Sequence, residues 1–430
     1  MSLALGVFLL AFVVFLLGGL PIAWSMLLAT LIWMALSNEL VFLLIVPDKI
    51  FQGMDVFILM SVPLFILVGE LLNAGRITDR LVQFANQFFG WISGGLAQVN
   101  VGSSILFSGI TGVALGDIAA LGRVFIPAMV KQGYSAEYAA AVTASSSIIG
   151  PMVPPSLIII IYGAATGVSI GALFAACVIP GLTVGLMQMM LVWWQAKKRG
   201  HTPVEEDRTA PALLSSATHS LVPMMVPVII LVGILGGIMT PTEAGAVAAF
   251  YALAVALGFY RSLKFRDLYD VFARTMSFSA RLLIIVACGA VFSLVMAIEN
   301  VPLLIQSAIE TASLSPFATL MIANLILLFV GMFIDPTAAI ILFAPILSKI
   351  AQTVGIDPVH FGVIMILNLN LGLLTPPLGI CLFAAEEIAG CGLPALIRET
   401  LPFLLVSFIV LIAVTYIPQL SLWLPSTLGF

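Results

Sequence analysis

An unusual polar segment occurs twice in this chain, each time inside sequence that is otherwise apolar enough to lie in a bilayer. The first, SSSIIGPMVPP, occupies 145–155, and the second, NLNLGLLTPP, occupies 368–377. Lipid offers no hydrogen bonds to backbone groups, so non-helical backbone at membrane depth must line a cavity or lie buried in protein. Matched breaks in the two halves of a chain are typical of the binding site of a secondary transporter. The sequence therefore predicts a transporter with one broken helix in each half.

An aspartate precedes each break and is followed ten residues later by a proline. Asp117 precedes Pro127, and Asp335 precedes Pro345. A charge inside a membrane is costly, so both aspartates are candidates for a functional site. They also have a structural interpretation, because Asp335 stands before Pro336 as an N-cap stands before a first-turn proline. Asp117 can cap a helix in the same way, and both roles remain open.

Composition excludes several other classes of protein. Of the 430 residues 62% are hydrophobic and 8% are charged, whereas soluble domains carry about 25% charged residues. The net charge of −4 offers no basic patch for nucleic acid. No Gly-Lys dipeptide occurs, so a Walker A loop is absent from this sequence. The cysteines and histidines show no metal-ligand spacing, and no enzyme activity or organic cofactor is indicated. With Glu39 as the first charge, we expect the N-terminal apolar span to be retained.

The apolar spans predict an all-α polytopic membrane protein made of two repeats. Each half contains five crossings, so the second repeat must be inverted relative to the first. If the first hairpin opens to the cytoplasm, every Lys and Arg except Lys49 and Lys349 falls on the cytoplasmic side, as the positive-inside rule requires. Both termini are then expected to be periplasmic. The predicted parts are a first repeat over 1–200 with a re-entrant hairpin at 92–130 and a broken helix at 136–169, a cytoplasmic linker over 201–220, and a second repeat over 221–430 with a hairpin at 316–350 and a broken helix at 358–388.

Stretches 77–91 and 301–314 are amphipathic and precede the two hairpins. They can lie in the membrane interface as arms or pack against a partner subunit. Glu70 lies near the end of a predicted span, and we expect it at the membrane interface.

The broken helices can supply oxygen ligands. Sodium is a hard cation that prefers oxygen, as calcium does, and carbonyls freed at a half-helix end can coordinate it. The N-terminus of the second half-helix can face an anionic group of a solute. We expect Pro155 and Pro377 to begin these half-helices. Alternatively, the serine and threonine hydroxyls bond back to their own helix.

The segment FSGITGVALGDIAALG at 107–122, together with the break at 145–156, resembles the large membrane (DctM-type, M) subunit of tripartite ATP-independent periplasmic (TRAP) transporters. The resemblance extends over essentially the whole chain. It implies an elevator-type fold and mechanism, sodium as the coupling ion, and a place in the bacterial inner membrane. It also implies a separate small four-helix membrane subunit, a periplasmic solute-binding protein, and an organic acid such as a C4-dicarboxylate or a sialic acid as the solute.

In this family each hairpin tip forms a sodium site with the break in its own repeat. One departure is Val113, which stands where the family tip often has a serine, so this position lacks a hydroxyl ligand. The resemblance and the oxygen-rich breaks together give the sodium-site candidates Gly109, Thr111, Gly112, Ser145, Ser146, Gly150, Gly331, Asp335, Thr337, Asn368, Asn370, Gly372 and Thr375. The solute-site candidates are Asp117, Ser147, Pro154, Pro155, Ser156, Pro376 and Pro377.

Two alternatives belong to other functional classes. An intramembrane aspartyl protease would use two aspartates that share a proton. Such an enzyme needs neither an inverted repeat nor paired breaks, and Ala114 stands where its motif would have a further glycine. A proton-coupled organic anion exchanger or a channel is the second alternative, which would need neither sodium nor a binding protein.

Overall fold

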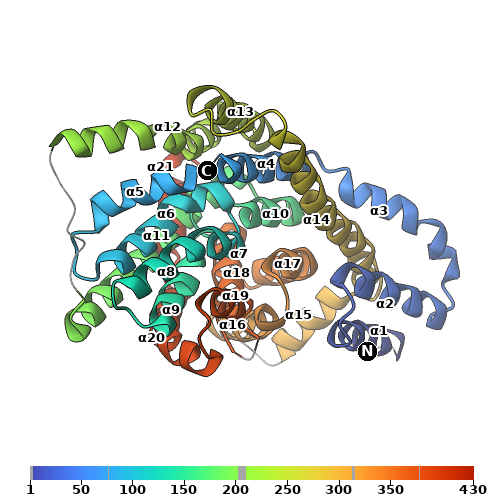
Figure 1. Ribbon diagram of the computed structural model, residues 1–430. Coiled ribbons are helices and arrows are strands. Elements are labelled where there is room, and N and C mark those ends of the chain that lie inside the picture. Colours follow the sequence, from blue (N-terminus) through green and yellow to red (C-terminus); the bar gives the residue numbers. More distant parts are fainter. Residues whose placement is uncertain (1–2, 76, 202–209, 312–314, 377) are drawn as a thin grey trace.

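Helices make up most of the described part of the chain (Figure 1). The computed structural model describes residues 3–75, 77–201, 210–311, 315–376 and 378–430, and of residues 40, 77–81, 107–111, 210–221 and 308–310 it describes the backbone alone. These residues contain no strand. Among the described helices, seven are long and apolar enough to cross a membrane, which confirms a polytopic all-α fold.

The first half contains the predicted hairpin and broken helix. The hairpin consists of α6, followed by α7 and α8, which a π-helical segment at Ile118–Gly122 joins into one continuous arm. The broken helix consists of α9 and α10. The helices are α1 (Leu3–Leu17), α2 (Ile22–Leu36), α3 (Val46–Met54), α4 (Ser61–Ala74), α5 (Ile77–Phe89), α6 (Gly95–Thr111), α7 (Ala114–Asp117), α8 (Arg123–Lys131), α9 (Ala136–Ser147), α10 (Leu157–Thr166) and α11 (Ile170–Arg199).

The second half repeats this order. Its hairpin is α16 with α17, and its broken helix is α18 with α19. Helix α12 begins at Ala210, so helix occupies the second part of the range predicted as a linker, while 202–209 lie outside the described residues. The helices are α12 (Ala210–Leu235), α13 (Pro241–Ala254), α14 (Asp267–Ile298), α15 (Val301–Thr311), α16 (Pro316–Phe333), α17 (Pro336–Thr353), α18 (Pro358–Gly372), α19 (Ile380–Ala389), α20 (Leu393–Tyr416) and α21 (Gln419–Leu428).

Local sequence signals set the ends of the hairpins and broken helices. Ser135 caps α9, Ser315 caps α16 and Asp357 caps α18, each accepting a backbone N–H of the first turn. Such caps satisfy N–H groups that have no partner within the helix. Gly167 and Gly390 follow α10 and α19 in the left-handed conformation that ends a helix.

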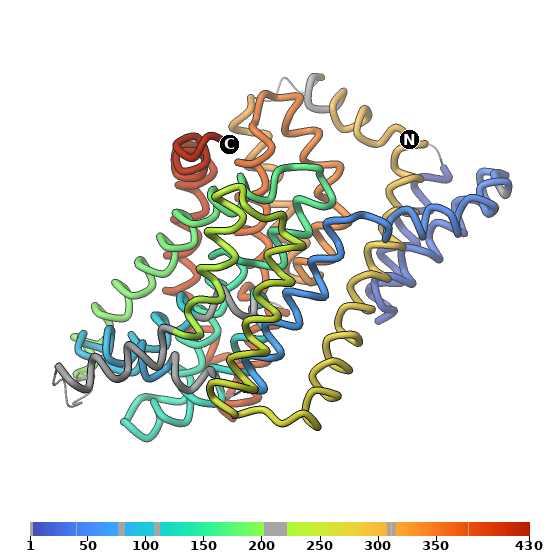
Figure 2. The backbone as a smooth tube through the Cα atoms, turned by 90° about the horizontal axis from the view of Figure 1, so that it is seen from above, coloured from blue at the N-terminus to red at the C-terminus, as the bar shows by residue number. Residues whose placement is uncertain are grey.

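The two hairpins open toward opposite ends of the molecule. Figure 2 shows the loop between α8 and α9 at one end, and the loop between α17 and α18 at the other. The N and C labels both lie at the end where the second hairpin opens. This is the inverted arrangement that the odd number of crossings per half predicts.

The helices can be divided into two bodies, which share buried packing. The core is defined as α6–α11 with α16–α21 and contains both broken helices, and its main hydrophobic cluster continues into α4, α12 and α13. The scaffold is defined as α1–α4 with α12–α14. In it the ring centroids of Phe8 and Phe292 lie 4.5 Å apart, in a second cluster that also takes in residues of α17. The bodies meet where α14 packs on α17 and where α4 and α12 pack on α6, α10 and α11. The amphipathic helix α5 packs on α6, and α15 packs on α17 (Figure 1).

Candidate functional site

The tip of the first hairpin lies against the break in its own half. Helix α6 ends at Thr111, and Gly112 turns the chain with a φ of +59°. A methyl group on Gly112 would lie 3.0 Å from the backbone nitrogen of Leu157 and 3.3 Å from the Cα of Ser156. Both the positive φ and this close approach require glycine. For Gly109 and Thr111 the structure describes the backbone alone.

Asp117 lies beside the same break but does not cap a helix. The second arm of the hairpin already begins at Ala114, because Gly112 makes the turn, so Asp117 has helical dihedrals. The prediction that Asp117 caps this helix is therefore wrong. Its side chain is 1% exposed, and its carboxylate packs so closely on Gly150 that a side chain at position 150 would collide with it.

The tip of the second hairpin lies against the break in the second half, backbone to backbone. A methyl group on Gly372 would lie 2.6 Å from the Cα of Gly331, and one on Gly331 would lie 3.1 Å from the carbonyl oxygen of Leu369. Asp335 caps α17 by accepting the N–H of Thr337 at 2.9 Å. The N-cap interpretation of Asp335 is confirmed.

A side-chain hydrogen bond also joins each hairpin to its broken helix. In the first half the hydroxyl of Ser104 on α6 donates to that of Ser146 on α9, 2.8 Å away. In the second half Asn368 on α18 donates its amide to the side-chain oxygen of Asn324 on α16, 2.7 Å away. The sequence prediction missed Ser104 and Asn324, although a polar residue two turns before each tip was the signal that could have found them.

Buried oxygen atoms without a donor gather at the breaks. Asn368 and Asn370 are fully buried, and among the described residues neither side-chain oxygen has a hydrogen-bond partner. The same holds for the hydroxyls of Ser145 and Ser156. Unsatisfied buried acceptors are rare and need an explanation such as an ion or a water molecule.

The other polar candidates at the breaks have protein partners. The hydroxyls of Ser146, Ser147 and Thr375 bond back to carbonyls of their own helices, as the alternative interpretation expected. The carbonyl of Ser145 accepts from Gln188 on α11 at 2.9 Å. Among the described residues no three His, Cys, Asp or Glu side chains gather as a metal site would require, so any ion here would be held by neutral oxygens and isolated carboxylates.

The half-helices begin later than the prolines. Helix α10 begins at Leu157, after Ser156 in an extended conformation. Helix α19 begins at Ile380, after Gly379 with a φ of +49°. The prediction that Pro155 begins α10 is therefore wrong, because Ser156 must stay extended where Gly112 packs on it. Pro377 lies outside the described residues.

Both hairpin tips reach one central cavity of about 360 Å³ between core and scaffold. The first tip contributes Val113, Leu115 and Gly116, and the second contributes Asp335, Thr337 and Ala338. The scaffold wall includes Glu70 and Asn73 of α4, with Phe278 and Leu282 of α14. Pockets for small ligands have about this size and this largely apolar lining. Of the predicted site residues, Asp335 and Thr337 line this cavity, whereas Asp117, Ser147, Pro154, Pro155, Ser156 and Pro376 do not.

Glu70 lies in the wall of this cavity, near the end of α4. Its carboxylate is 3.4 Å from the Nε of Arg274 on α14, and its side chain is 29% exposed. The expectation that it lies at the membrane interface stays a prediction.

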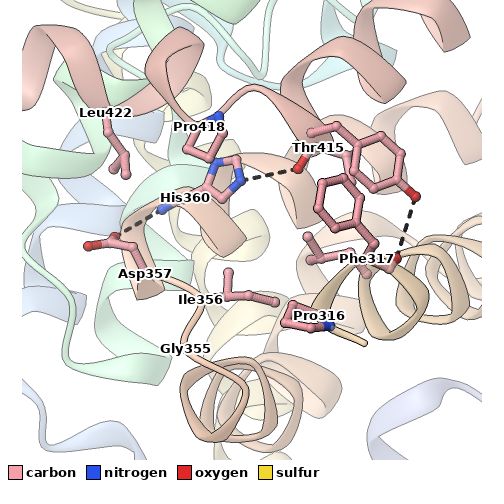
Figure 3. Close-up of a pocket in the computed structure, with 11 residues that line it drawn as sticks. Pro316, Phe317, Gly355, Ile356, Asp357, His360, Thr415, Pro418 and Leu422 are labelled. Carbon is pink, nitrogen blue, oxygen red and sulfur yellow. Dashed lines mark hydrogen bonds between the residues drawn. The ribbon is translucent and has the colours of Figure 1, made fainter. Parts of the chain in front are cut away.

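A second cavity of about 260 Å³ opens at the outer end of the second hairpin, between α16, α18, α20 and α21 (Figure 3). His360 is 3% exposed, with Nδ1 2.6 Å from the hydroxyl of Ser421 and Nε2 3.4 Å from the carbonyl oxygen of Thr415. Asp357 accepts the backbone N–H of His360 at the rim (Figure 3). None of the predicted site residues lines this cavity.

The sequence of this chain is similar to a known protein family over most of its length. The family model "Tripartite ATP-independent periplasmic transporter, DctM component" matches residues 9–420. The C4-dicarboxylate TRAP transporter large permease protein DctM of Pseudomonas aeruginosa is 38% identical over 92% of this chain and 94% of its own length. The sialic acid TRAP transporter large permease protein SiaM of Vibrio cholerae is 38% identical, with 95% of each chain covered.

A third relative is longer than this chain. The isethionate TRAP transporter permease protein DctMQ of Oleidesulfovibrio alaskensis is 37% identical over 96% of this chain, which spans only 65% of that relative.

Solved structures share the fold at low sequence identity. The YdaH transporter of Alcanivorax borkumensis, described as having an unusual topology, superposes with a TM-score of 0.67 at 14% identity over 99% of this chain and all of its own. MtrF of Neisseria gonorrhoeae superposes with a TM-score of 0.62 at 14% identity over 89% of this chain and 85% of its own. Because the family model and the relatives cover nearly the whole chain, this protein belongs to the DctM component family of tripartite ATP-independent periplasmic transporters.

Proposed function

We propose that this chain is the solute-translocating subunit of a sodium-driven importer of an organic acid. As a member of its family it is a multi-pass inner-membrane permease. The observation that carries the proposal is the central cavity, because both hairpin tips and the scaffold meet at it. A solute bound there would touch every part that must move during transport.

The walls of the cavity favour an organic anion whose charge is balanced by cations. The N-terminal turn of α17 lines it with Thr337 and Ala338, and the positive end of a helix attracts carboxylates. Asp335 and Glu70 add negative charge, of which Arg274 offsets one. An anion entering beside these carboxylates therefore needs further positive charge, which sodium ions at the hairpin tips would supply. Relatives named for C4-dicarboxylates, sialic acid and 2,3-diketo-L-gulonate support a carboxylate-bearing solute.

Sodium would bind where each tip meets its break. Sodium takes oxygen ligands, and the buried oxygens of Ser145, Asn368 and Asn370 have no donor among the described residues. The backbone contacts of Gly112 and of Gly331 with the breaks hold the tips close to these oxygens. Cation binding would thus hold each hairpin closed on its broken helix, and it would couple the ion to the solute-bound tips.

Transport would move the core against the scaffold as an elevator. The two bodies meet where α14 packs on α17 and where α4 and α12 pack on α6, α10 and α11. The cavity lies between the bodies, so a shift of the core would carry the solute across the membrane. A separate small membrane subunit and a periplasmic binding protein would complete the system, as the word tripartite in the family description implies. Both termini would face the periplasm, on the side where the second hairpin opens.

The test is thermal unfolding of the purified chain in detergent, in sodium chloride against potassium chloride at equal ionic strength. A ligand that binds only the folded state stabilises it by about 2.7 kcal/mol at 100 times its dissociation constant. We expect a saturable, sodium-selective rise in the unfolding temperature. The same temperature in both salts would argue against these cation sites and favour a proton-coupled exchanger or a channel.

A further inference from the structure

A chain of buried side chains runs from α20 to the break after α18. Thr415 on α20 accepts from the side-chain amide of Asn324 on α16, 3.0 Å away. The side-chain oxygen of Asn324 accepts from the amide of Asn368 on α18 at 2.7 Å, and its backbone carbonyl accepts from the same amide at 3.0 Å. The three side chains are at most 9% exposed. They form a continuous hydrogen-bonded path that ends beside the second break.

Thr415 sets the direction of the side-chain bonds in this path, and the backbone carbonyl of Asn324, which can only accept, requires an N–H of Asn368 as well. The hydroxyl proton of Thr415 is donated to the carbonyl of Leu411 in its own helix, 2.7 Å away, so only lone pairs face Asn324. Asn324 must then turn its NH₂ group toward Thr415 and its oxygen toward Asn368. Asn368 must in turn direct its NH₂ group to Asn324, which leaves its own oxygen on the other edge of the amide plane.

That oxygen is the one without a partner among the described residues. If the side-chain oxygen of Asn324 turns away, only the backbone carbonyl of Asn324 still keeps the Asn368 amide from rotating by half a turn and exchanging its donor and acceptor edges. A rotated Asn368 would offer N–H groups, which repel a cation, at the position where the present orientation offers an acceptor. Asn368 also directly precedes Leu369, the residue whose backbone contacts Gly331 of the hairpin tip.

We propose that Thr415 and Asn324 are positioning residues that fix Asn368 with its side-chain oxygen available to a cation at the second hairpin; this rests on the sodium coupling proposed above. A ligand held in its binding orientation loses less conformational freedom on binding. Thr415 itself is held from the other side, since His360 approaches its carbonyl in the outer cavity (Figure 3).

The first half orients an amide at a different place. Asn100 on α6 donates its side-chain amide to the hydroxyl of Thr143 on α9, 2.7 Å away, and Thr143 donates to the carbonyl of Ala139 in its own helix. This bond fixes an amide of the hairpin, whereas the serine nearer the break, Ser146, accepts from the hydroxyl of Ser104, and a hydroxyl can rotate to donate or to accept. The path from Thr415 therefore acts on the second candidate cation site.

The test substitutes Thr415 and measures sodium affinity in the full chain. Thr415→Val keeps the shape of the side chain but removes the lone pairs that orient Asn324. We expect the sodium concentration for half-maximal thermal stabilisation to rise about tenfold, which corresponds to the loss of one oriented hydrogen bond. Thr415→Ser retains the hydroxyl and should keep the wild-type sodium concentration. If Thr415→Val does not fold, Thr415→Ala can replace it, and we expect the same rise in the sodium concentration for half-maximal stabilisation.

Thr400→Val is the matched control. Thr400 lies on the same helix, is 2% exposed, and bonds back to the carbonyl of Leu396 at 2.9 Å in the same way as Thr415 does to Leu411. No described side chain donates to it. We expect Thr400→Val to lower the unfolding temperature in potassium chloride as much as Thr415→Val does. The sodium concentration for half-maximal thermal stabilisation should stay at the wild-type value.

A double-mutant cycle isolates the path. Asn324→Ala removes the side chain through which Thr415 acts on Asn368. Adding Thr415→Val to Asn324→Ala should therefore raise the sodium concentration for half-maximal stabilisation no further, which the cycle would measure as coupling.

The outcomes separate this inference from the function on which it rests. Wild-type sodium affinity in Thr415→Val, or equal weakening in Thr400→Val, would overturn the positioning role while sodium coupling stands. A wild-type chain with no sodium-selective stabilisation would overturn the sodium coupling and the positioning role with it.

Discussion

Asp335 combines two properties that substitutions can separate. Its carboxylate caps α17 by accepting the N–H of Thr337, and its side chain lines the central cavity. A cap needs only an oxygen acceptor, which asparagine also provides. A role in binding cations or balancing the solute needs the negative charge. Asp357 offers a reference, because it caps α18 before Pro358 in the same way but lies at the outer cavity.

We expect Asp335→Ala to abolish uptake in cells and to destabilise the fold by about 1 kcal/mol through the lost cap. Asp335→Asn should keep the stability but weaken the sodium dependence of uptake, because the charge is gone. The measurements are uptake of a candidate organic acid and thermal unfolding. As a control, Asp357→Ala should cost similar stability and leave uptake intact. Unimpaired uptake by Asp335→Ala would contradict a role for this residue at the cavity.

Gly372 tests the close approach of the second hairpin to its break. Replacement by alanine would put a methyl group 2.6 Å from the Cα of Gly331, and backbone atoms cannot move aside as a flexible side chain can. We expect Gly372→Ala to destabilise the chain by about 1–3 kcal/mol, the usual cost of overpacking, and to remove sodium-selective stabilisation. Gly258→Ala is the control, since a methyl group there meets no atom within 4 Å. Retained sodium stabilisation in Gly372→Ala would show that the contact is not needed for cation binding.

At the scale of the elements, the sequence predicts the two hairpins and the two broken helices well. Few backbone structures other than a continuous helix are possible at membrane depth. Polar and glycine-rich centres in the apolar stretches 92–130 and 316–350 therefore predict re-entrant hairpins there. Polarity and glycine content do not predict that Asp117 lies inside a helix or that Ser156 stays extended. The turn at Gly112 and its contact with the start of α10 determine both. Likewise, hydropathy does not reveal that Glu70 lines the cavity that both hairpin tips reach.

The inverted orientation of the hairpins leads to a labelling prediction. Gln132 follows the second arm of the first hairpin, and Gln352 lies in the last turn of the second; both are exposed. In a chain whose native cysteines are replaced, we expect Gln352→Cys to react with a membrane-impermeant thiol reagent in intact cells. Gln132→Cys should react only after the cells are permeabilised, since positive charge places that loop in the cytoplasm. Labelling of both from one side would overturn the inverted arrangement.

At the scale of the whole molecule, the proposed motion requires α17 of the core to slide along α14 of the scaffold. In a membrane, helix association depends on close van der Waals packing, which small residues permit. Gly289 on α14 faces Ile341 on α17 across this interface. Further along the same two helices, Leu342, Ile346 and Ile350 of α17 belong to one buried cluster with Phe292 of α14. The close approach at Gly289 is therefore the place where a cross-link can fix the two bodies.

A cross-link between Gly289 and Ile341 tests the elevator directly. A Cβ on Gly289 would lie 4.0 Å from that of Ile341, within the range of about 3.5–4.5 Å that a disulfide requires. We expect the variant Gly289→Cys with Ile341→Cys, in a chain without native cysteines, to lose uptake on oxidation and to regain it on reduction. Sodium-selective stabilisation should survive oxidation, because both cation sites lie within the core. The control pair Gly233→Cys with Met239→Cys, whose Cβ atoms would lie 3.6 Å apart within the scaffold, should transport in either state. Full uptake by the oxidised Gly289–Ile341 pair would mean that α17 does not move past α14, and transport would then have to occur through a fixed core.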